Sequence, residues 1–232
     1  MGTRNLTVII KDNKIRLSQY GQWDGYFDYT GVKFLEFVKE HIQSATGERY
    51  SVNLQKFKDK TNLLADIDDE TLNAYREIYR NYGINGGERS NNTGKFAIPL
   101  HIFFPTLSRD TGVNILNIIQ QLEPYEFTDY TRPKKTVKTT RFWKWHFPIM
   151  IDTDCSVIEF AYIIDLDNER IYMLTNHEFD GEPLETTELV KNTYKSLNCW
   201  YNCKIQDIPT IEQVNMDRKS IHLDYTEVKV DK

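Results

Sequence analysis

Hydrophobic and polar side chains alternate near the start of the chain, a pattern typical of β-strands. Residues 4–10 are rich in types that favour strands, and residues 14–20 alternate between two sets of side chains. The three residues 11–13 between these runs predict a tight hairpin connection. One face of the second strand is expected to carry Ile15, Leu17 and Gln19, and the other face Arg16, Ser18 and Tyr20.

A spacing of three to four residues between hydrophobic positions predicts helices in the middle of the chain. The first is expected over residues 31–44, with Thr30 as its N-cap, and the second over residues 69–81. A third is expected to begin near residue 108 and to end before Pro124, because proline interrupts a helix.

The last hundred residues predict a second hairpin and one more helix. Residues 157–165 and 170–175 flank a short polar connection and read as paired strands. Residues 187–204 predict a terminal helix. Strands at both ends indicate a single α+β domain over residues 1–232, with a helical section over 31–125. Its antiparallel sheet is expected to join the N-terminal and C-terminal hairpins and to pack against the helices.

The composition is that of an ordinary globular protein. Hydrophobic residues make up 40% of the chain and charged residues 27%, and the net charge is −5. This charge gives no general attraction to nucleic acid or to anionic membranes. No apolar run is long enough for a membrane span or a signal peptide, and three cysteines form no disulfide framework. We therefore expect a cytoplasmic protein that has no cofactor and no membrane partner, with a homo-oligomer as an open alternative.

The segment QYGQWDGY, residues 19–26, is rich in aromatic and amide side chains for a connection between a strand and a helix. One interpretation is a binding site, where free N–H groups near Gly31 attract an anionic group and the rings stack on a flat ligand. The other is a structural plug, in which the rings close the core and Asp24 forms a turn with Gly25. The candidate ligand-binding residues are Arg4, Gln19, Tyr20, Gln22, Trp23, Asp24 and Tyr26.

The stretch MGTRNLT at residues 1–7, followed by QYGQWDGY, resembles a family of uncharacterised proteins of bacteriophages and bacteria, with relatives in fungi. SRDTG at 108–112 and YIIDLD at 162–167 resemble later landmarks of the same family. Members usually follow the loop tyrosine with proline and closely spaced glycines, whereas FDYTG follows Tyr26 here. The resemblance implies a fold and a phage or bacterial origin, and it supplies no reaction.

A basic segment with interleaved aromatic residues lies at 132–145 and contains no acidic residue. Such a pattern suits single-stranded nucleic acid through phosphate contacts and base stacking. It equally suits an exposed strand that is guarded by lysines and turns its tryptophans inward. The candidate nucleic-acid-binding residues are Arg132, Lys134, Lys135, Lys138, Arg141, Trp143, Lys144 and Trp145.

Three weaker patterns point to structure rather than to chemistry. Asp110-Thr-Gly112 matches the short aspartic-protease signature but lacks the apolar strand that should precede it. Asp165 and Asp167 lie in an acidic stretch that fails the calcium-loop pattern, and a solvated hairpin is the simpler interpretation. Cys199 and Cys203 are expected on one face of the terminal helix as buried thiols. We predict no metal site.

These observations favour a non-catalytic binding protein of phage or mobile-element origin. Its expected partner is a host protein, as for an inhibitor of host defences, or a small nucleotide-like ligand held by the 19–26 loop. A hydrolase that uses this loop as its pocket, with Asp24 as acid or base, is the first alternative. A single-stranded nucleic-acid binder that uses residues 132–145 is the second.

Overall fold

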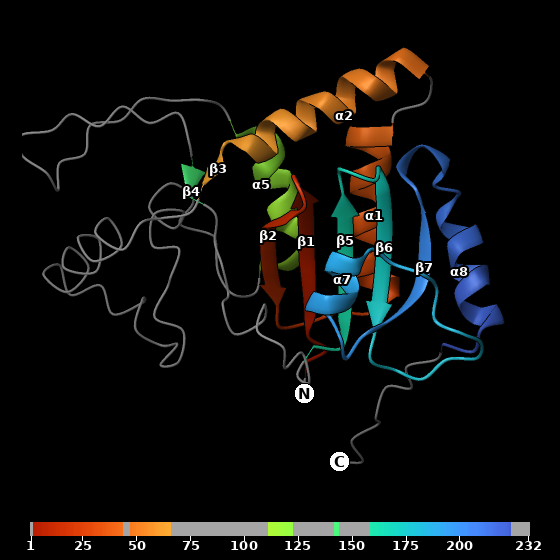
Figure 1. The fold of residues 1–232 in the computed structure, drawn as a ribbon. Coiled ribbons are helices and arrows are strands. Elements are labelled where there is room, and N and C mark those ends of the chain that lie inside the picture. The colour runs from red at the N-terminus through yellow and green to blue at the C-terminus, as the bar shows by residue number, and fades with distance from the viewer. Residues whose placement is uncertain (1, 44–46, 66–110, 123–141, 144–157, 224–232) are drawn as a thin grey trace, which may run out of the picture.

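The fold is seen in a computed structural model of the whole chain (Figure 1). The structure describes residues 2–43, 47–65, 111–122, 142–143 and 158–223. The predicted helix over 69–81 lies outside these residues.

A five-stranded sheet forms the centre of the molecule, in the order β2-β1-β5-β6-β7. The strands are β1 (Asn5–Lys11), β2 (Lys14–Gly21), β5 (Phe160–Asp165), β6 (Arg170–Thr175) and β7 (Asn198–Lys204). Both predicted hairpins are confirmed, and so is the α+β class. The sheet is mixed rather than antiparallel throughout, because β1 and β5 run parallel where the two hairpins join.

The turns of the two hairpins hold each other at one end of this parallel junction. Asp12 and Asn13 both have positive φ, of 57° and 51°, as a two-residue hairpin turn of the favoured twist requires. Their backbone N–H groups donate to the carboxylate of Asp167, over 2.9 and 2.8 Å. A side chain of the second turn therefore satisfies the backbone donors of the first.

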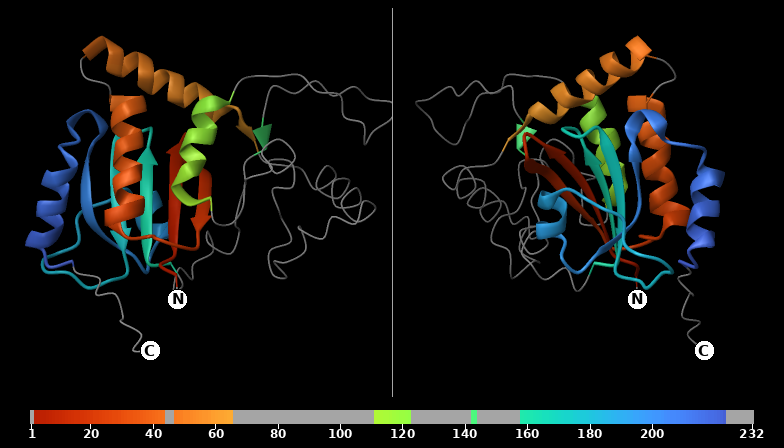
Figure 2. Two further views of the ribbon diagram at one scale, coloured as in Figure 1. Left: turned by 180° about the vertical axis from the view of Figure 1, so that it is seen from behind. Right: turned by 45° about the vertical axis from the view of Figure 1, so that its right-hand side comes forward.

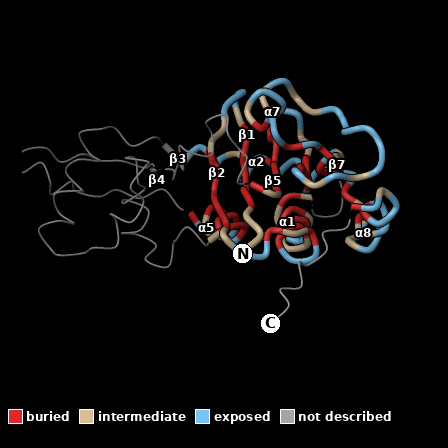
Figure 3. Tube along the Cα trace, turned by 90° about the horizontal axis from the view of Figure 1, so that it is seen from below, coloured by how far each residue is buried: buried red, intermediate tan, exposed pale blue. Residues whose placement is uncertain are grey.

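Helices cover the two faces of the sheet unequally, as Figures 2 and 3 show. On one face lie α1 (Val32–Val38), α5 (Ile115–Gln121) and α8 (Ile211–Ser220). The short helix α7 (Glu188–Thr193) lies on the other face. At one end of the sheet, α2 (Gly47–Asn62) crosses above α1 and α5 and leads to β3 (Leu64–Ala65), which pairs in parallel with β4 (Phe142–Trp143).

Alternate side chains of the strands divide the core in two. Leu6 and Val8 of β1 pack with Ile163 and Tyr194 in a smaller core on the α7 face. The larger core, on the face of α1, α5 and α8, contains Ile9, Leu17, Phe34, Leu116, Tyr162 and Val214, among others. None of the helices in the described ranges is long and apolar enough to cross a membrane.

The helix predicted over 31–44 begins earlier than expected. A π-helical turn over Phe27–Gly31 precedes α1, and another over Lys39–Gln43 follows it. Thr30 does not cap the helix, because its hydroxyl donates to the carbonyl oxygen of Asp24. The third predicted helix is confirmed where the structure describes it, as a 3-10 turn over Gly112–Asn114 followed by α5.

The predicted helix over 187–204 is wrong, since its second half is the edge strand β7. Tyr201 faces Met173 of β6 and Cys199 faces Leu174, so Trp200 is an extra residue in the ladder. This bulge turns Trp200 and Tyr201 together into the larger core, whereas Cys199 lies in the smaller one. The bulge therefore breaks the period of two by which a strand is recognised.

A second bulge changes the expected faces of β2. Ile10 pairs with Ile15 and Ile9 with Leu17, which leaves Arg16 as the extra residue. Ile15 consequently packs on the smaller core, whereas Leu17 lies in the larger one. The prediction placed Ile15 on the same face as Leu17 and Gln19. The structure corrects this for Ile15, which lies on the opposite face from Leu17.

Candidate functional site

Residues from distant parts of the chain meet at the end of the sheet where β1 begins and β2 ends. Asn5 and Tyr162 lie on the parallel strands β1 and β5. Both contact the 19–26 loop, which follows β2. Gly112 lies close to the last residue of β2, since a Cβ on Gly112 would lie 3.5 Å from the Cα of Gly21. Segments separated by more than a hundred residues thus build one structural unit.

Hydrogen bonds with Thr3, Thr30 and Tyr162 hold the backbone of the loop at Asp24 and Gly25. The N–H of Gly25 donates to the carbonyl of Thr3 over 3.1 Å. The carbonyl of Gly25 accepts the hydroxyl of Tyr162 over 2.7 Å, in a buried position. A Cβ on Gly25 would lie 2.7 Å from the Thr3 oxygen, so this close approach requires glycine. The loop is consequently fixed to β1 and β5.

Asn5 secures the preceding part of the loop. Its side-chain amide donates to the carbonyls of Gly21 and Trp23, each over 3.3 Å, and the residue is 1% exposed. A Cβ on Gly21 would lie 2.7 Å from this amide. Neither Asn5 nor Tyr162 was among the candidate residues, because only the tertiary pairing of β1 with β5 brings them to the loop.

The first two residues of the loop are buried in the fold. Gln19 is 0% exposed, and its amide donates to the carbonyl of Tyr20 over 2.7 Å. Tyr20 is 5% exposed and packs in the smaller core, with its hydroxyl donating to Gln22 over 2.7 Å. The structure therefore does not place Gln19 and Tyr20 where a ligand could stack on them or read their polar groups.

The middle of the loop is displayed to solvent. Trp23 is 57% exposed, and part of its ring lies against Gly2, where a Cβ would approach its Cε3 to 2.2 Å. Asp24 is also exposed and has a φ of 52°, a left-handed conformation that costs most non-glycine residues strain. Tyr26 is half-buried, and its hydroxyl lies 3.5 Å from the Asp24 carboxylate.

The N–H groups near Gly31, which were expected to attract an anionic group, are already paired. The N–H groups of Tyr29, Thr30 and Gly31 all donate to the carbonyl of Tyr26, over 3.2, 3.0 and 3.4 Å. The π-helical turn therefore uses the donors that a helix N-terminus would otherwise leave free. Arg4, the remaining candidate, runs beside the loop, and its backbone N–H donates to the carboxylate of Glu159 over 3.1 Å.

A histidine and a carboxylate lie close to this end of the sheet, which bears on the hydrolase alternative. The Nε2 of His177 is 3.7 Å from the carboxylate of Glu159, and its ring stacks on Phe160 at 5.1 Å between centroids. Within the described part of the chain, the side-chain contact of Asp24 is with Tyr26 and not with a histidine or cysteine. The acid–base partner that the alternative requires for Asp24 is therefore not supplied by these residues.

The acidic hairpin between β5 and β6 uses its carboxylates to hold its own turn. Asp165 is 0% exposed and accepts the N–H groups of Asp167 and Asn168, over 3.1 and 3.0 Å, and the side-chain amide of Asn168 over 2.9 Å. No cluster of three metal-ligating side chains occurs among the residues that the structure describes. These carboxylates already bind backbone donors, so they stabilise the turn.

The two cysteines of β7 are separated by the bulge rather than aligned on a helix. Cys199 is 3% exposed, and its Sγ donates to the carbonyl of Tyr201 over 3.3 Å. Burial raises the pKa of the Cys199 thiol to about 12, and burial also raises the pKa of Cys203. Both thiols are therefore protonated near neutral pH, which makes them poor nucleophiles.

The remaining sequence candidates fall largely outside the described residues. Of the basic segment 132–145, the structure describes Phe142 and Trp143 alone, as strand β4. Asp110 of the protease-like triplet is not described either, whereas Gly112 begins a 3-10 turn with a φ of 50°. The nucleic-acid interpretation of this segment remains a prediction.

Comparison with models of protein families, with curated proteins and with solved structures gives no match for this chain. The functional argument therefore depends on the geometry of the 19–26 loop.

Proposed function

We propose that this protein is a non-catalytic binding protein whose 19–26 loop contacts a protein partner through Trp23. One observation carries the proposal: a tryptophan that is 57% exposed extends from a backbone fixed by hydrogen bonds on both sides of it. A rigid aromatic side chain loses little conformational entropy on binding, and tryptophan is enriched among residues that dominate binding energy. Trp23 is the expected anchor, with Asp24 and Tyr26 beside it.

The exposure of Asp24 supports the same proposal. Aspartate is one of the few non-glycine residues that adopts a left-handed backbone readily, so its φ of 52° is compatible with a loop that presents its carboxylate to solvent. The carboxylate makes one side-chain contact among the described residues, the 3.5 Å approach of the Tyr26 hydroxyl. The described contacts of the carboxylate with the fold are therefore weak, and it lies exposed beside Trp23, where a partner could contact both side chains.

A protein partner suits this geometry better than a nucleotide-like ligand does. Small-molecule sites are concave and bury most of their ligand. Three cavities lie among the described residues, and none of these three is lined by the 19–26 loop. Tyr20 is buried in the core, so Trp23 is the most exposed ring of the loop. Part of the Trp23 ring packs against Gly2, which leaves less of it for stacking on a flat ligand.

The resemblance of the N-terminal segments to phage and bacterial proteins supports a bacterial host protein as the partner. A phage accessory protein that inhibits a host defence would have this form, namely a folded domain that presents one anchor residue. This part of the proposal rests on association with a class of proteins rather than on the geometry.

Affinity capture from a bacterial lysate tests the proposal. Immobilised wild-type protein, Trp23→Ala and Met216→Ala are compared, and the retained proteins are identified by mass spectrometry. Met216 is a matched control, because it is 60% exposed on α8 and lies on another element. We expect a host protein that wild type and Met216→Ala retain and Trp23→Ala loses.

A parallel thermal-shift screen separates the two kinds of partner. If a nucleotide raises the melting temperature of the wild type and Trp23→Ala abolishes the shift, the ligand is nucleotide-like and a protein partner is excluded as the primary target. If no nucleotide shifts the melting temperature and all three proteins capture the same set, the binding role of the loop is refuted.

A further inference from the structure

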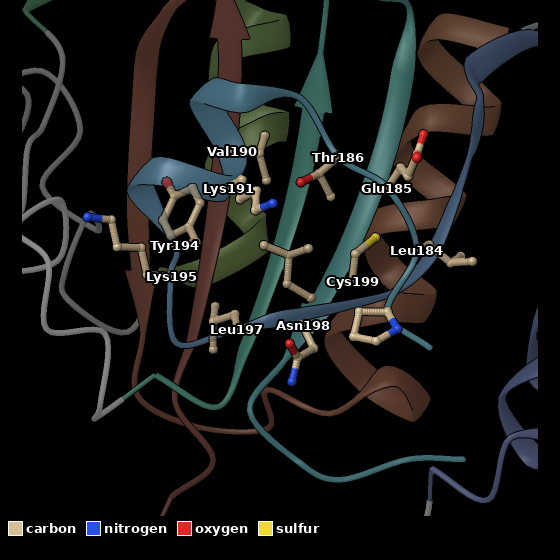
Figure 4. A pocket seen from close by; sticks show the side chains of 12 residues that line it. Leu184, Glu185, Thr186, Val190, Lys191, Tyr194, Lys195, Leu197, Asn198 and Cys199 are labelled. Atoms are coloured by element: carbon tan, nitrogen blue, oxygen red, sulfur yellow. The ribbon is translucent and has the colours of Figure 1, made fainter. Parts of the chain in front are cut away.

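A hollow of about 400 Å³ lies beside α7, on the face of the sheet opposite α1 (Figure 4). Its walls are the extended segment 183–186, α7 and the first residues of β7. Two hydrogen bonds fix the outer wall to β7: the N–H of Leu184 donates to Cys199 over 2.8 Å, and Asn202 donates to the carbonyl of Glu185 over 2.9 Å. The hollow is therefore preformed, and its size is that of a small-molecule site.

The floor of the hollow is apolar. Leu174, Leu197 and Cys199 belong to the smaller core and are 1%, 8% and 3% exposed, so they are rigidly packed. Leu184 borders the hollow and is 45% exposed, and Figure 4 shows its side chain directed away from the middle of the hollow. The Cys199 thiol contributes apolar surface and no nucleophile, because burial raises its pKa to about 12. An apolar group of a ligand could pack against this floor.

Polar groups stand at one end of this floor. Figure 4 shows the ammonium group of Lys191 and the hydroxyl of Thr186 directed toward the middle of the hollow, whereas the carboxylate of Glu185 points away from it. Neither Lys191 nor the neighbouring Lys195 forms an ion pair with the residues that the structure describes. Lys191 therefore presents a positive charge that has no ion-pair partner among the described residues, in the same hollow as the Thr186 hydroxyl.

We propose that this hollow binds a small monocarboxylate with an apolar tail. The carboxylate would accept from the ammonium of Lys191 and the hydroxyl of Thr186, and charge-assisted hydrogen bonds of this kind are among the strongest that proteins form. The tail would lie over Leu174 and Leu197. The site does not depend on the function proposed for the 19–26 loop, which lies at the end of the sheet rather than on its α7 face.

Isothermal titration of the full chain with decanoate tests the proposal, with acetate and decanol as probes that lack the tail or the charge. We expect decanoate to bind at least tenfold more tightly than either. Lys191→Gln should weaken decanoate at least tenfold, whereas Lys219→Gln, an exposed lysine on α8, should leave the affinity unchanged.

Two further readouts keep the result independent of folding. Lys191 is exposed, so Lys191→Gln should have the same melting temperature as the wild type. Amide NMR signals of Thr186, Lys191 and Asn198 should shift on titration. The proposal fails if decanoate gives no saturable heat, if decanol binds equally well, or if Lys191→Gln binds within twofold of the wild type.

Discussion

The hydroxyl of Tyr162 donates a buried hydrogen bond of 2.7 Å to the carbonyl of Gly25, 137 positions earlier in the chain. This contact joins the central strand β5 to the 19–26 loop. Together with the bond from Gly25 to Thr3, it decides how the loop leaves the sheet. The display of Trp23 therefore depends on a tyrosine in the middle of the fold.

Replacing Tyr162 by phenylalanine should destabilise the protein by about 1–3 kcal/mol, because the Gly25 carbonyl is left buried without its donor. Urea unfolding measures the change. Tyr172→Phe is the control: Tyr172 is 2% exposed, but its hydroxyl makes no hydrogen bond within the described part of the structure. If both substitutions lowered the free energy of unfolding equally, the hydrogen bond from Tyr162 to Gly25 would add no stability of its own.

The Asp165 carboxylate should act as a structural group of the β5–β6 turn. Asp165→Ala removes the acceptor of two backbone N–H groups, and we expect a loss of about 2–3 kcal/mol in the free energy of unfolding. Asp180→Ala, an exposed carboxylate that pairs with His222, should change it by less than about 0.5 kcal/mol. Millimolar calcium should not raise the wild-type melting temperature, and a clear rise would contradict this account of the turn.

Cys199 should be protected from alkylation until the protein unfolds. Its pKa is raised by burial from 9.0 to about 12, so iodoacetamide at pH 8 should leave it unmodified, and denaturant should expose it. Peptide mass spectrometry assigns the modified residue. Rapid labelling of Cys199 in the native protein would contradict the buried position of this thiol.

The same shift predicts how stability changes at high pH. The folded state retains the Cys199 proton up to a pKa of about 12, whereas an exposed thiol loses it near 9.0. Burial also raises the pKa of Tyr172, from 10.0 to about 12. Both groups therefore stabilise the fold fully below about pH 9, and that contribution is lost between pH 9 and 12. The urea midpoint of the wild type should decrease from pH 9 to 12. The urea midpoint of Cys199→Ala should decrease less steeply over the same range.

The hairpins could be predicted because their signals are local. Asp12 and Asn13 are residue types that accept a positive φ, and alternating side chains flank them. The parallel pairing of β1 with β5 could not be predicted, since it joins segments that are 155 residues apart and no local pattern encodes it. The convergence of Asn5, Gly25 and Tyr162 follows from that pairing.

The bulge at Trp200 explains the one element that was predicted wrongly. In a regular strand Trp200 and Tyr201 would point to opposite faces, whereas both lie in the larger core. Two adjacent buried aromatics after Tyr194 and Leu197 match a helical spacing better than a strand, so the pattern favoured a helix. The sequence alone also could not show which aromatic residues of the 19–26 loop are buried. Tyr20 and Trp23 are both aromatic, and only the packing of the folded chain makes Tyr20 buried and Trp23 exposed.

The most direct test of the central claim is the affinity of the captured host protein for wild type and for Trp23→Ala, measured by isothermal titration. Trp23 is exposed, so the substitution should leave the urea midpoint unchanged. We expect the affinity to fall at least about thirtyfold, equivalent to 2 kcal/mol, as for a dominant interface residue. An affinity within threefold of the wild type, at equal stability, would contradict the role of Trp23 as the anchor.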